Sequence, residues 1–212
     1  MDRHADSVAG FPLAFWAALI TLLSTVVKRT RGDTVNRDLP ERSHGVQRFL
    51  DENRTNSQVR MVSGSARTAQ EAADVLGCTV AEIAKSIVFR AKTSNRPVLV
   101  IACGDNRVNE KKVAALIGEK IGRADAEFVR TRTGFAIGGV APFAHKEPPL
   151  VVVDTMVQRF PCMWAAGGTP ETMFSIATAD LIRLAGGPLA DSPTRARIAP
   201  AQEPWPSLEF RQ

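Results

Sequence analysis

A loop with two adjacent glycines and a proline is the feature that most constrains this chain. The residues from Thr133 to Lys146 read TGFAIGGVAPFAHK, so Gly138 and Gly139 stand four and three positions before Pro142. Glycine tolerates positive φ and lets another group approach the backbone closely, whereas proline stiffens the chain and lacks an amide donor. Such a loop offers main-chain N–H groups, which suit an ester, a carboxylate or a phosphate. A Gly-Gly pair by itself also marks an ordinary turn.

The apolar periodicity on both sides of this loop predicts a mixed α/β domain. Helices are expected to begin at residues whose side chains can cap them, namely Ser43, Thr68, Thr79, Asn109, Asp125 and Thr178. Strands are expected at 59–62, 86–90, 97–102, 150–153, 162–166 and 173–176. The second and third of these strands are separated by a short turn and predict a hairpin. Because helices and strands interleave irregularly, we expect a mixed sheet flanked by helices.

Length and charge bound the organisation of the chain. Its 212 residues fit one domain with appendages, or at most two small domains. A content of 44% hydrophobic residues is enough for a sizeable core. The formal net charge of +5 favours polyanionic partners, although a solvated surface explains such a charge equally well.

Cysteine and histidine are too sparse and too scattered for metal chemistry. A structural or catalytic zinc site needs clustered ligands, and the candidates lie far apart, at Cys78, Cys103, Cys162, His4, His44 and His145. The absence of a Cys-x-x-Cys pair also argues against a disulfide framework and favours a reducing cytoplasm. We therefore expect no metal and no cofactor.

The N-terminal segment allows two interpretations. Residues 10–27 run for 18 positions without a charge and are followed by Lys28, Arg29 and Arg31. This length is at the short end of what crosses a bilayer, and the flanking cations would place the rest of the chain at the inner face of the membrane. A start codon assigned too far upstream would append a similar segment. Residues 1–42 are thus predicted to be a leader, and the proline-rich residues 192–212 a loose tail.

Lys85 and His145 are the titratable residues with a candidate chemical role. Lys85 stands among apolar neighbours where a short helix is expected to meet a strand. A lysine in this position either extends its ammonium to the surface or binds a phosphate or carbonyl oxygen. His145 follows the glycine loop and is either an acid–base group or an ordinary surface histidine. The chain shows no Ser-His-Asp order, phosphate-binding P-loop or dinucleotide fingerprint.

Six segments in a fixed order carry a resemblance to a known family. They are TAQEAA at 68–73, AKSIVFR at 84–90, GDNRV at 104–108, GFAIGGVAP at 134–142, VVVD at 151–154 and WAAGG at 164–168. Together, over roughly residues 43–191, they resemble the YbaK / prolyl-tRNA-synthetase-associated editing domain family. The resemblance implies a barrel-like mixed α/β domain that hydrolyses amino acids wrongly attached to tRNA.

The resemblance also implies which residues form the site. Lys85 matches the functional lysine of the family, and the segment from Gly138 through Gly139 to Pro142 matches its G-x-x-x-P loop. Residues implied to line the substrate site are Phe89, Val140, Ala141, Phe143, His145, Gly167 and Gly168. One position departs from the family pattern, because Ala144 stands where many members have glycine.

The expected activity follows from this resemblance. The chain is too short for the catalytic modules of a synthetase, so a freestanding deacylase for alanine or cysteine on tRNA, notably proline tRNA, is implied. Its partners would be aminoacylated tRNA and prolyl-tRNA synthetase. An aminoacyl ester is already activated, so orientation and backbone donors can replace a strong nucleophile. A non-catalytic module that binds tRNA or a synthetase through the same cleft is the alternative.

Overall fold

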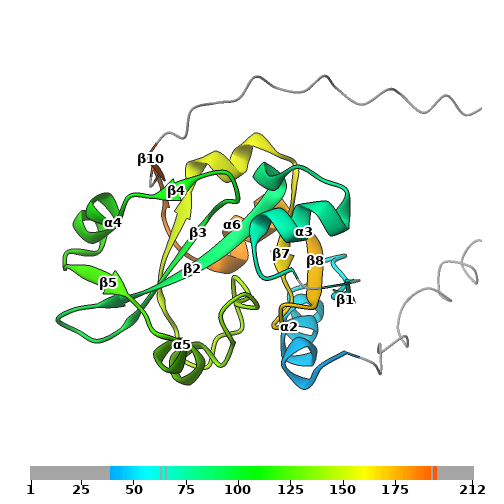
Figure 1. Cartoon of the computed structure of the whole chain (residues 1–212), viewed down its shortest axis with the longest axis horizontal. Helices are drawn as coiled ribbons and strands as arrows, with labels where there is room; N and C mark the ends of the chain where they lie inside the picture. The colour runs from blue at the N-terminus through cyan, green and yellow to red at the C-terminus, as the bar shows by residue number, and fades with distance from the viewer. Residues whose placement is uncertain (1–38, 63, 65, 192, 195–212) are drawn as a thin grey trace, which may run out of the picture. The chain divides into compact units, whose positions relative to one another are not determined.

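A mixed sheet of eight strands forms the centre of the computed structural model, which describes residues 39–62, 64, 66–191 and 193–194 (Figure 1). Its hydrogen-bonded order is β1-β8-β7-β2-β3-β6-β9, and β5 pairs with β2 outside this path. The strands are β1 (Arg60–Met61), β2 (Ile83–Ala91), β3 (Pro97–Cys103), β5 (Ile121–Arg123), β6 (Leu150–Asp154), β7 (Cys162–Ala166), β8 (Thr172–Ala177) and β9 (Leu189–Ala190). Two further strands, β4 (Arg107–Val108) and β10 (Pro193–Thr194), form a separate antiparallel pair.

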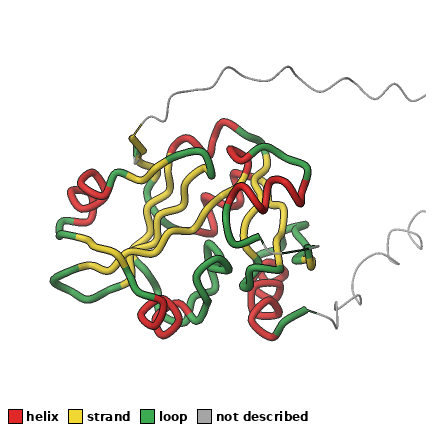
Figure 2. Tube along the Cα trace, in the orientation of Figure 1, coloured by secondary structure: helices red, strands yellow, loops and turns green. Residues whose placement is uncertain are grey.

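Within the described residues, five helices lie around this sheet (Figure 2). They are α2 (Glu41–Glu52), α3 (Ala69–Leu76), α4 (Glu110–Ile117), α5 (Ala126–Thr133) and α6 (Thr178–Ala185), with short 3-10 helices η1 (Val80–Glu82) and η2 (Thr155–Arg159). The predicted caps of three helices are confirmed: the side chains of Thr68, Asn109 and Asp125 accept backbone N–H groups of the first turn. The mixed α/β architecture expected from the sequence is therefore confirmed.

The hairpin of β2 and β3 is also confirmed and forms the longest ladder of the sheet. Seven residue pairs join the two strands, from Ala84 opposite Cys103 to Arg90 opposite Pro97. Every residue of β3 is buried, which agrees with its continuous run of aliphatic side chains. On one side of it, β6 adds a parallel strand, so β3 lies inside the sheet.

The prediction that Ser43 caps the first helix was wrong. Helix α2 begins at Glu41, after Pro40, and Ser43 lies within its first turn. The Ser43 side chain is buried, and its Oγ forms a hydrogen bond of 3.0 Å with Oγ1 of Thr172 in β8. The Ser43 hydroxyl therefore bonds to a residue that is distant in the sequence and does not cap its own helix. Sequence spacing cannot reveal such a tertiary partner.

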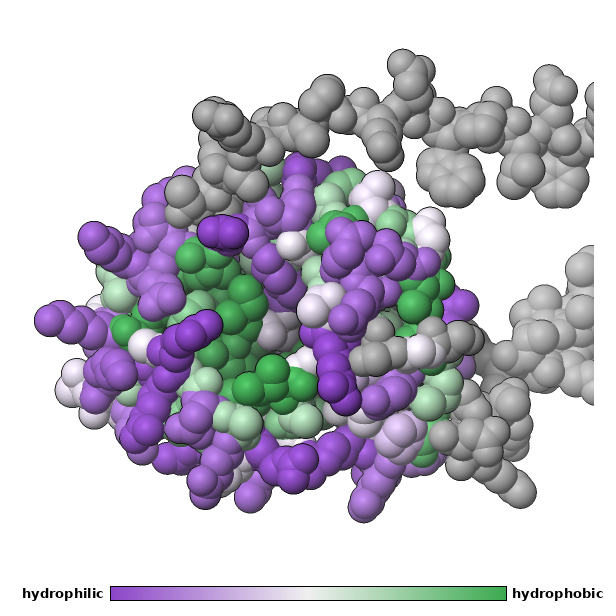
Figure 3. Space-filling view, viewed as in Figure 1, coloured by the Kyte–Doolittle hydropathy of each residue, from purple (hydrophilic) through white to green (hydrophobic). Residues whose placement is uncertain are grey.

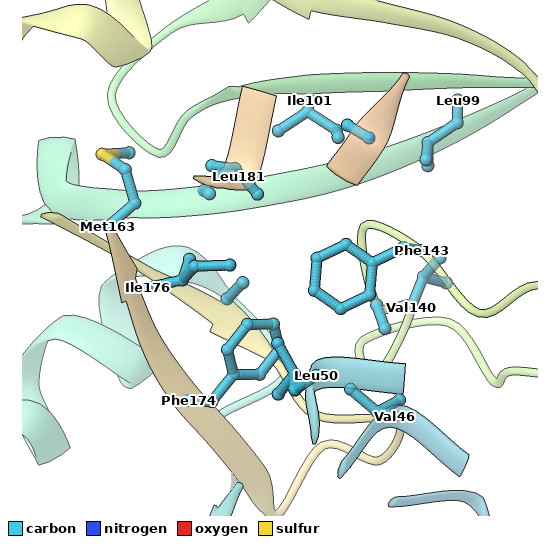
Figure 4. Close-up of a cluster of buried hydrophobic side chains, with 14 of the residues drawn as sticks. Val46, Leu50, Leu99, Ile101, Val140, Phe143, Met163, Phe174, Ile176 and Leu181 are labelled. Carbon is cyan, nitrogen blue, oxygen red and sulfur yellow. The ribbon is translucent and has the colours of Figure 1, made fainter. Parts of the chain in front are cut away.

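The main hydrophobic core lies between the sheet, α2, α6 and the glycine loop. Figure 4 shows side chains from all of these elements converging, with Leu50 of α2 near Phe174 of β8 and Phe143 of the loop near Val140. Phe143 stacks on Phe49 at a centroid distance of 4.8 Å and lies 5.6 Å from Phe174. This packing fixes the loop against the body of the domain.

Described residues just outside the predicted limits of 43 and 191 also take part in the fold. Leu39 is buried in the main core, and Pro193 and Thr194 pair with β4. Among the described residues no helix is long and apolar enough to span a bilayer. The apolar segment 10–27 and most of the predicted tail lie outside the described residues.

Candidate active site

One edge of β2 is left open in the middle of the strand. On the side away from β3, β7 pairs with β2 only at Ile83 and Ala84, and β5 pairs with it only from Phe89 to Ala91. Between them, residues 85–88 have no neighbouring strand on this side within the described part of the chain. A sheet edge of this kind exposes unpaired backbone donors and acceptors.

A cavity of about 810 Å³ lies at this open edge. Its walls come from β2, the start of α3, the segment that joins β5 to α5, and the glycine loop. In the space-filling view, an apolar hollow near the centre of the molecule is surrounded by hydrophilic residues (Figure 3). Small and aliphatic side chains provide much of the lining, among them Ala66, Ala69, Ala72, Ala124, Ala166, Ile87, Val88, Val129 and Met173. The volume falls within the range of small-molecule sites.

Lys85 lines this cavity from within β2, not from the end of a helix as its sequence position suggested. Its Nζ donates to the carbonyl oxygen of Gly104 at 3.0 Å and to that of Asn106. Burial lowers the pKa of Lys85, and the charge of Asp105 partly opposes this effect. An ammonium has three donor hydrogens, so two hold the group in place and one remains for a ligand.

Asn106 and Asp154 support this arrangement from behind, and the sequence analysis did not single them out as site residues. The Nδ2 of Asn106 donates to Oδ2 of Asp154 at 3.0 Å, and both side chains are buried. Oδ1 of Asp154 accepts the N–H of Met156 at 3.1 Å. Burial raises the pKa of Asp154, although both hydrogen bonds favour its charged form. The sequence signal that could have identified this pair is Asp154 itself, a carboxylic acid directly after the aliphatic run of β6.

The glycine loop reaches the cavity through Gly138, whose φ is +88° and whose main chain lies beside Arg67. The N–H of Gly138 has no hydrogen-bond partner among the described residues. The N–H of Gly139, in contrast, donates to the carbonyl of Ala136 at 3.0 Å. Gly139 does not line the cavity; it packs against the main chain of Thr169. Of the two expected donors, only that of Gly138 is therefore free.

The remaining predicted site residues divide into three groups. Phe89 and Val140 line the cavity. Ala141, Pro142 and Phe143 are buried and hold the loop in place, but they do not contribute to the cavity wall.

The third group, Gly167, Gly168 and His145, lies away from the cavity wall. Gly167 and Gly168 form the tight connection before β8, where Gly168 has φ +111° and lies against the backbone of Arg42. His145 borders a separate hollow of about 410 Å³ beside α2.

His145 acts on the loop through a hydrogen bond. Its Nε2 donates to the carbonyl of Ala141 at 2.9 Å, which requires the proton on that nitrogen. Desolvation lowers the pKa of His145 to about 4. The neighbouring Ala144 has φ +59°, a backbone conformation that favours glycine, so the departure from the family pattern places a methyl group on a left-handed residue.

Acid is expected to destabilise the domain through His145. Its pKa falls from 6.5 in the unfolded chain to about 4 in the folded one, so between these values the unfolded state binds more protons and stability falls as pH falls. The contribution lost by pH 4 is about 3 kcal/mol. Chemical denaturation at pH 7.5 and pH 4.5 measures it, with His145→Gln as the control that should show a smaller change. An equal pH dependence in both proteins would contradict this assignment.

Several cavity residues were not among the predicted site residues. Arg67 and Arg123 bring guanidinium groups to the cavity, and neither has a carboxylate within ion-pair distance in the part of the chain that the structure describes. Ser86 and Asp125 add a hydroxyl and a carboxylate. Because these residues come from three separate segments, no local motif could have grouped them.

Comparisons with known proteins show which family this chain is similar to. The family described as aminoacyl-tRNA editing domain matches residues 63–184. The uncharacterized protein YwhH of Bacillus subtilis is 31% identical over 133 residues, which cover 63% of this chain and 83% of that protein. The proline–tRNA ligase of Limosilactobacillus fermentum is 36% identical over 97 residues, which cover 44% of this chain and 17% of the ligase.

A solved structure extends the likeness to the fold. A crystal structure described as that of a proposed trans-editing enzyme for prolyl tRNA synthetase has 35% sequence identity and a TM-score of 0.69. The match covers 74% of this chain and all of that chain. The match to the family over more than half of the chain, together with this fold, assigns membership: the chain belongs to the aminoacyl-tRNA editing domain family.

Proposed function

We propose that this protein is a freestanding deacylase that hydrolyses the ester of a small amino acid wrongly attached to tRNA, with alanine or cysteine on proline tRNA as the leading substrates. The observation that carries the proposal is the meeting of Lys85 and the free N–H of Gly138 at one apolar cavity. Family membership supports an editing role. The likeness to part of a proline–tRNA ligase supports proline tRNA as the carrier.

The cavity suits a small apolar side chain. Four alanines and Met173 form much of its wall around the start of α3 and the end of β7. Size alone discriminates weakly, because one methylene in an apolar pocket is worth only about 1–3 kcal/mol. We therefore expect a preference for the smallest side chains and a graded loss of rate as the side chain grows.

The reaction needs no protein nucleophile. A water molecule attacks the acyl carbon and gives up a proton, either directly or through the neighbouring hydroxyl of the terminal ribose; the bond to the ribose oxygen breaks, and that oxygen takes a proton. Negative charge develops on the acyl oxygen, where a preorganised N–H donor is effective. Gly138 and the third hydrogen of the Lys85 ammonium are the donors that we assign to this oxygen or to the adjacent phosphate.

The cations at the cavity suit the nucleic acid that carries the substrate. Arg67 lies at the start of α3 and Arg123 at the end of β5, so both can contact phosphates of the acceptor end. We assign aminoacylated tRNA as the partner on this basis. Association with prolyl-tRNA synthetase and a cytoplasmic location belong to the same proposal.

A panel of charged tRNAs tests the proposed function. The full chain is expected to release alanine or cysteine from proline tRNA at least tenfold faster than it releases proline, because a small apolar pocket favours the smaller side chain. Release of the labelled amino acid is followed over time, with uncatalysed hydrolysis subtracted. Tight binding of tRNA without release would support the non-catalytic alternative, and equal rates on all substrates would contradict the proposed selectivity.

A further inference from the structure

The register of β2 shows which backbone groups face the cavity. The N–H of Ala91 donates to the carbonyl of Arg96 at the hairpin end. In an antiparallel ladder, alternate residues point to the same partner strand, so the odd-numbered residues of β2 face β3. Pro97, which has no N–H, lies opposite the even-numbered Arg90, as this assignment requires.

The opposite edge of β2 confirms the alternation. The N–H of Lys92, just after the strand, donates to the carbonyl of Lys120 on the β5 side at 2.8 Å. Even-numbered residues therefore turn their N–H and C=O groups away from β3. Ser86 and Val88 are the even-numbered residues in the gap between β7 and β5, and both line the cavity.

Most of these groups have no hydrogen-bond partner in the part of the chain that the structure describes. Among the described residues, the N–H and C=O of Ser86 and the N–H of Val88 have no hydrogen-bond partner. The pairing of Phe89 with Arg123 places the C=O of Val88 against the N–H of Ala124, so that carbonyl is not free. The Oγ of Ser86 is buried and has no partner among those residues. Buried polar groups are almost always paired in folded proteins, so this cluster of four polar atoms at one cavity indicates a bound ligand.

An aminoacyl ester has a donor and an acceptor that can pair with the free backbone groups of this edge. Its α-ammonium and ester carbonyl flank one α-carbon, with the spacing of the N–H and C=O of one strand residue. In an antiparallel pair, two opposed residues exchange both of their hydrogen bonds. A single amino acid can thus pair with a strand edge as a one-residue strand, in the manner of peptides that extend a sheet.

We propose that the open edge of β2 at Ser86 and Val88 binds the aminoacyl group itself: a carbonyl of this edge accepts the α-ammonium, and an N–H donates to the ester carbonyl. This inference rests on the proposed function and deepens it, because it assigns the substrate's main-chain groups to named backbone atoms. The edge binds the α-ammonium and the carbonyl, which all aminoacyl esters share. Selectivity for the side chain then comes from the apolar wall of the cavity.

The test removes single backbone N–H groups. The full chain is made with the α-hydroxy acid counterpart of serine at position 86 or of valine at position 88, which replaces the N–H by an oxygen. The counterpart of isoleucine at position 87 is the matched control, because that N–H faces β3. On alanyl-tRNA, at least one of the changes at 86 and 88 is expected to lower kcat/KM about tenfold. The change at 87 should lower the melting temperature more than it lowers kcat/KM.

A second measurement tests the carbonyl side. Lactyl-tRNA, in which a hydroxyl replaces the α-ammonium, is expected to be hydrolysed at least tenfold more slowly than alanyl-tRNA, after correction for the uncatalysed rates. If both backbone changes leave kcat/KM within twofold of the unaltered protein, the inference is overturned while the deacylase remains. Equal corrected rates on lactyl- and alanyl-tRNA overturn the assignment of the ammonium.

The inference also has a readout that does not need catalysis. If the unaltered protein hydrolyses no aminoacyl-tRNA, the proposed function fails. Binding of 3′-alanylamino-3′-deoxyadenosine, which has an amide in place of the ester, then decides the inference. Shifts of the Ser86 and Val88 amide resonances, larger than that of Ile87, support the edge as the binding site, and unchanged resonances at saturation overturn it.

Discussion

Replacing Lys85 by alanine is expected to lower kcat/KM for deacylation by about two to three orders of magnitude, the range found when one donor to a developing oxyanion is removed. The Lys85 ammonium is held by the carbonyls of Gly104 and Asn106 and lines the cavity. The measurement is the release of labelled alanine from proline tRNA under single-turnover conditions, which separates chemistry from product release.

Two further variants separate loss of the charge from loss of the fold. Lys85→Met retains a long side chain without the ammonium and should be as inactive as Lys85→Ala. Lys112→Ala removes a lysine whose ion pair with Asp191 is exposed, and it should retain full activity, since such pairs contribute little. A Lys85→Met protein that folds and keeps its rate would exclude Lys85 from the catalytic site.

Replacing Gly139 by alanine is expected to destabilise the domain by about 1–3 kcal/mol, as overpacking of a well-packed region does. An added Cβ would lie 2.5 Å from Cα of Thr169 and 2.6 Å from its carbonyl carbon. These are main-chain atoms, so no change of side-chain rotamer can relieve the clash. The loop must move instead, and Gly138 will move with it, so deacylation should fall together with stability.

Thermal unfolding and the deacylation rate measure the two effects of Gly139→Ala. Gly45→Ala is the matched control, because an added Cβ there has no heavy atom within 4 Å. Gly45 is an exposed residue in the interior of α2. This control should gain about 0.5–1 kcal/mol, since alanine is favoured over glycine within a helix, and should keep its activity. A Gly139→Ala protein as stable as the unaltered one would show that the loop is not held against Thr169.

Local sequence was sufficient wherever the structure depends on neighbouring residues. The capping box at Thr68 formed as its spacing predicted, and at Thr79 the Glu82 carboxylate accepts the N–H of Thr79. The alternation of turn and apolar residues located the hairpin of β2 and β3. Ser43 shows the limit, because its hydroxyl bonds to Thr172 and not to its own helix.

The site itself was predicted only in part. The resemblance placed Lys85 and Gly138 in one site, and both line the cavity; their catalytic roles remain predictions. It also included Pro142 and Phe143, which are buried and hold the loop in place, and it gave no role to Arg67 or Ser86. A motif identifies a loop as a unit, but it cannot separate residues that face a ligand from those that hold the loop.

The sequence by itself determined the elements and the order in which they follow one another, because capping, turn formation and apolar periodicity act over a few residues. The tertiary structure alone decided where β2 has no neighbour. That gap exists because β7 leaves β2 after Ala84 and β5 joins it only at Phe89. The free backbone groups of Ser86 and Val88 come from this pairing of distant segments, and backbone groups are the same in every residue, so no reading of side chains could have located them.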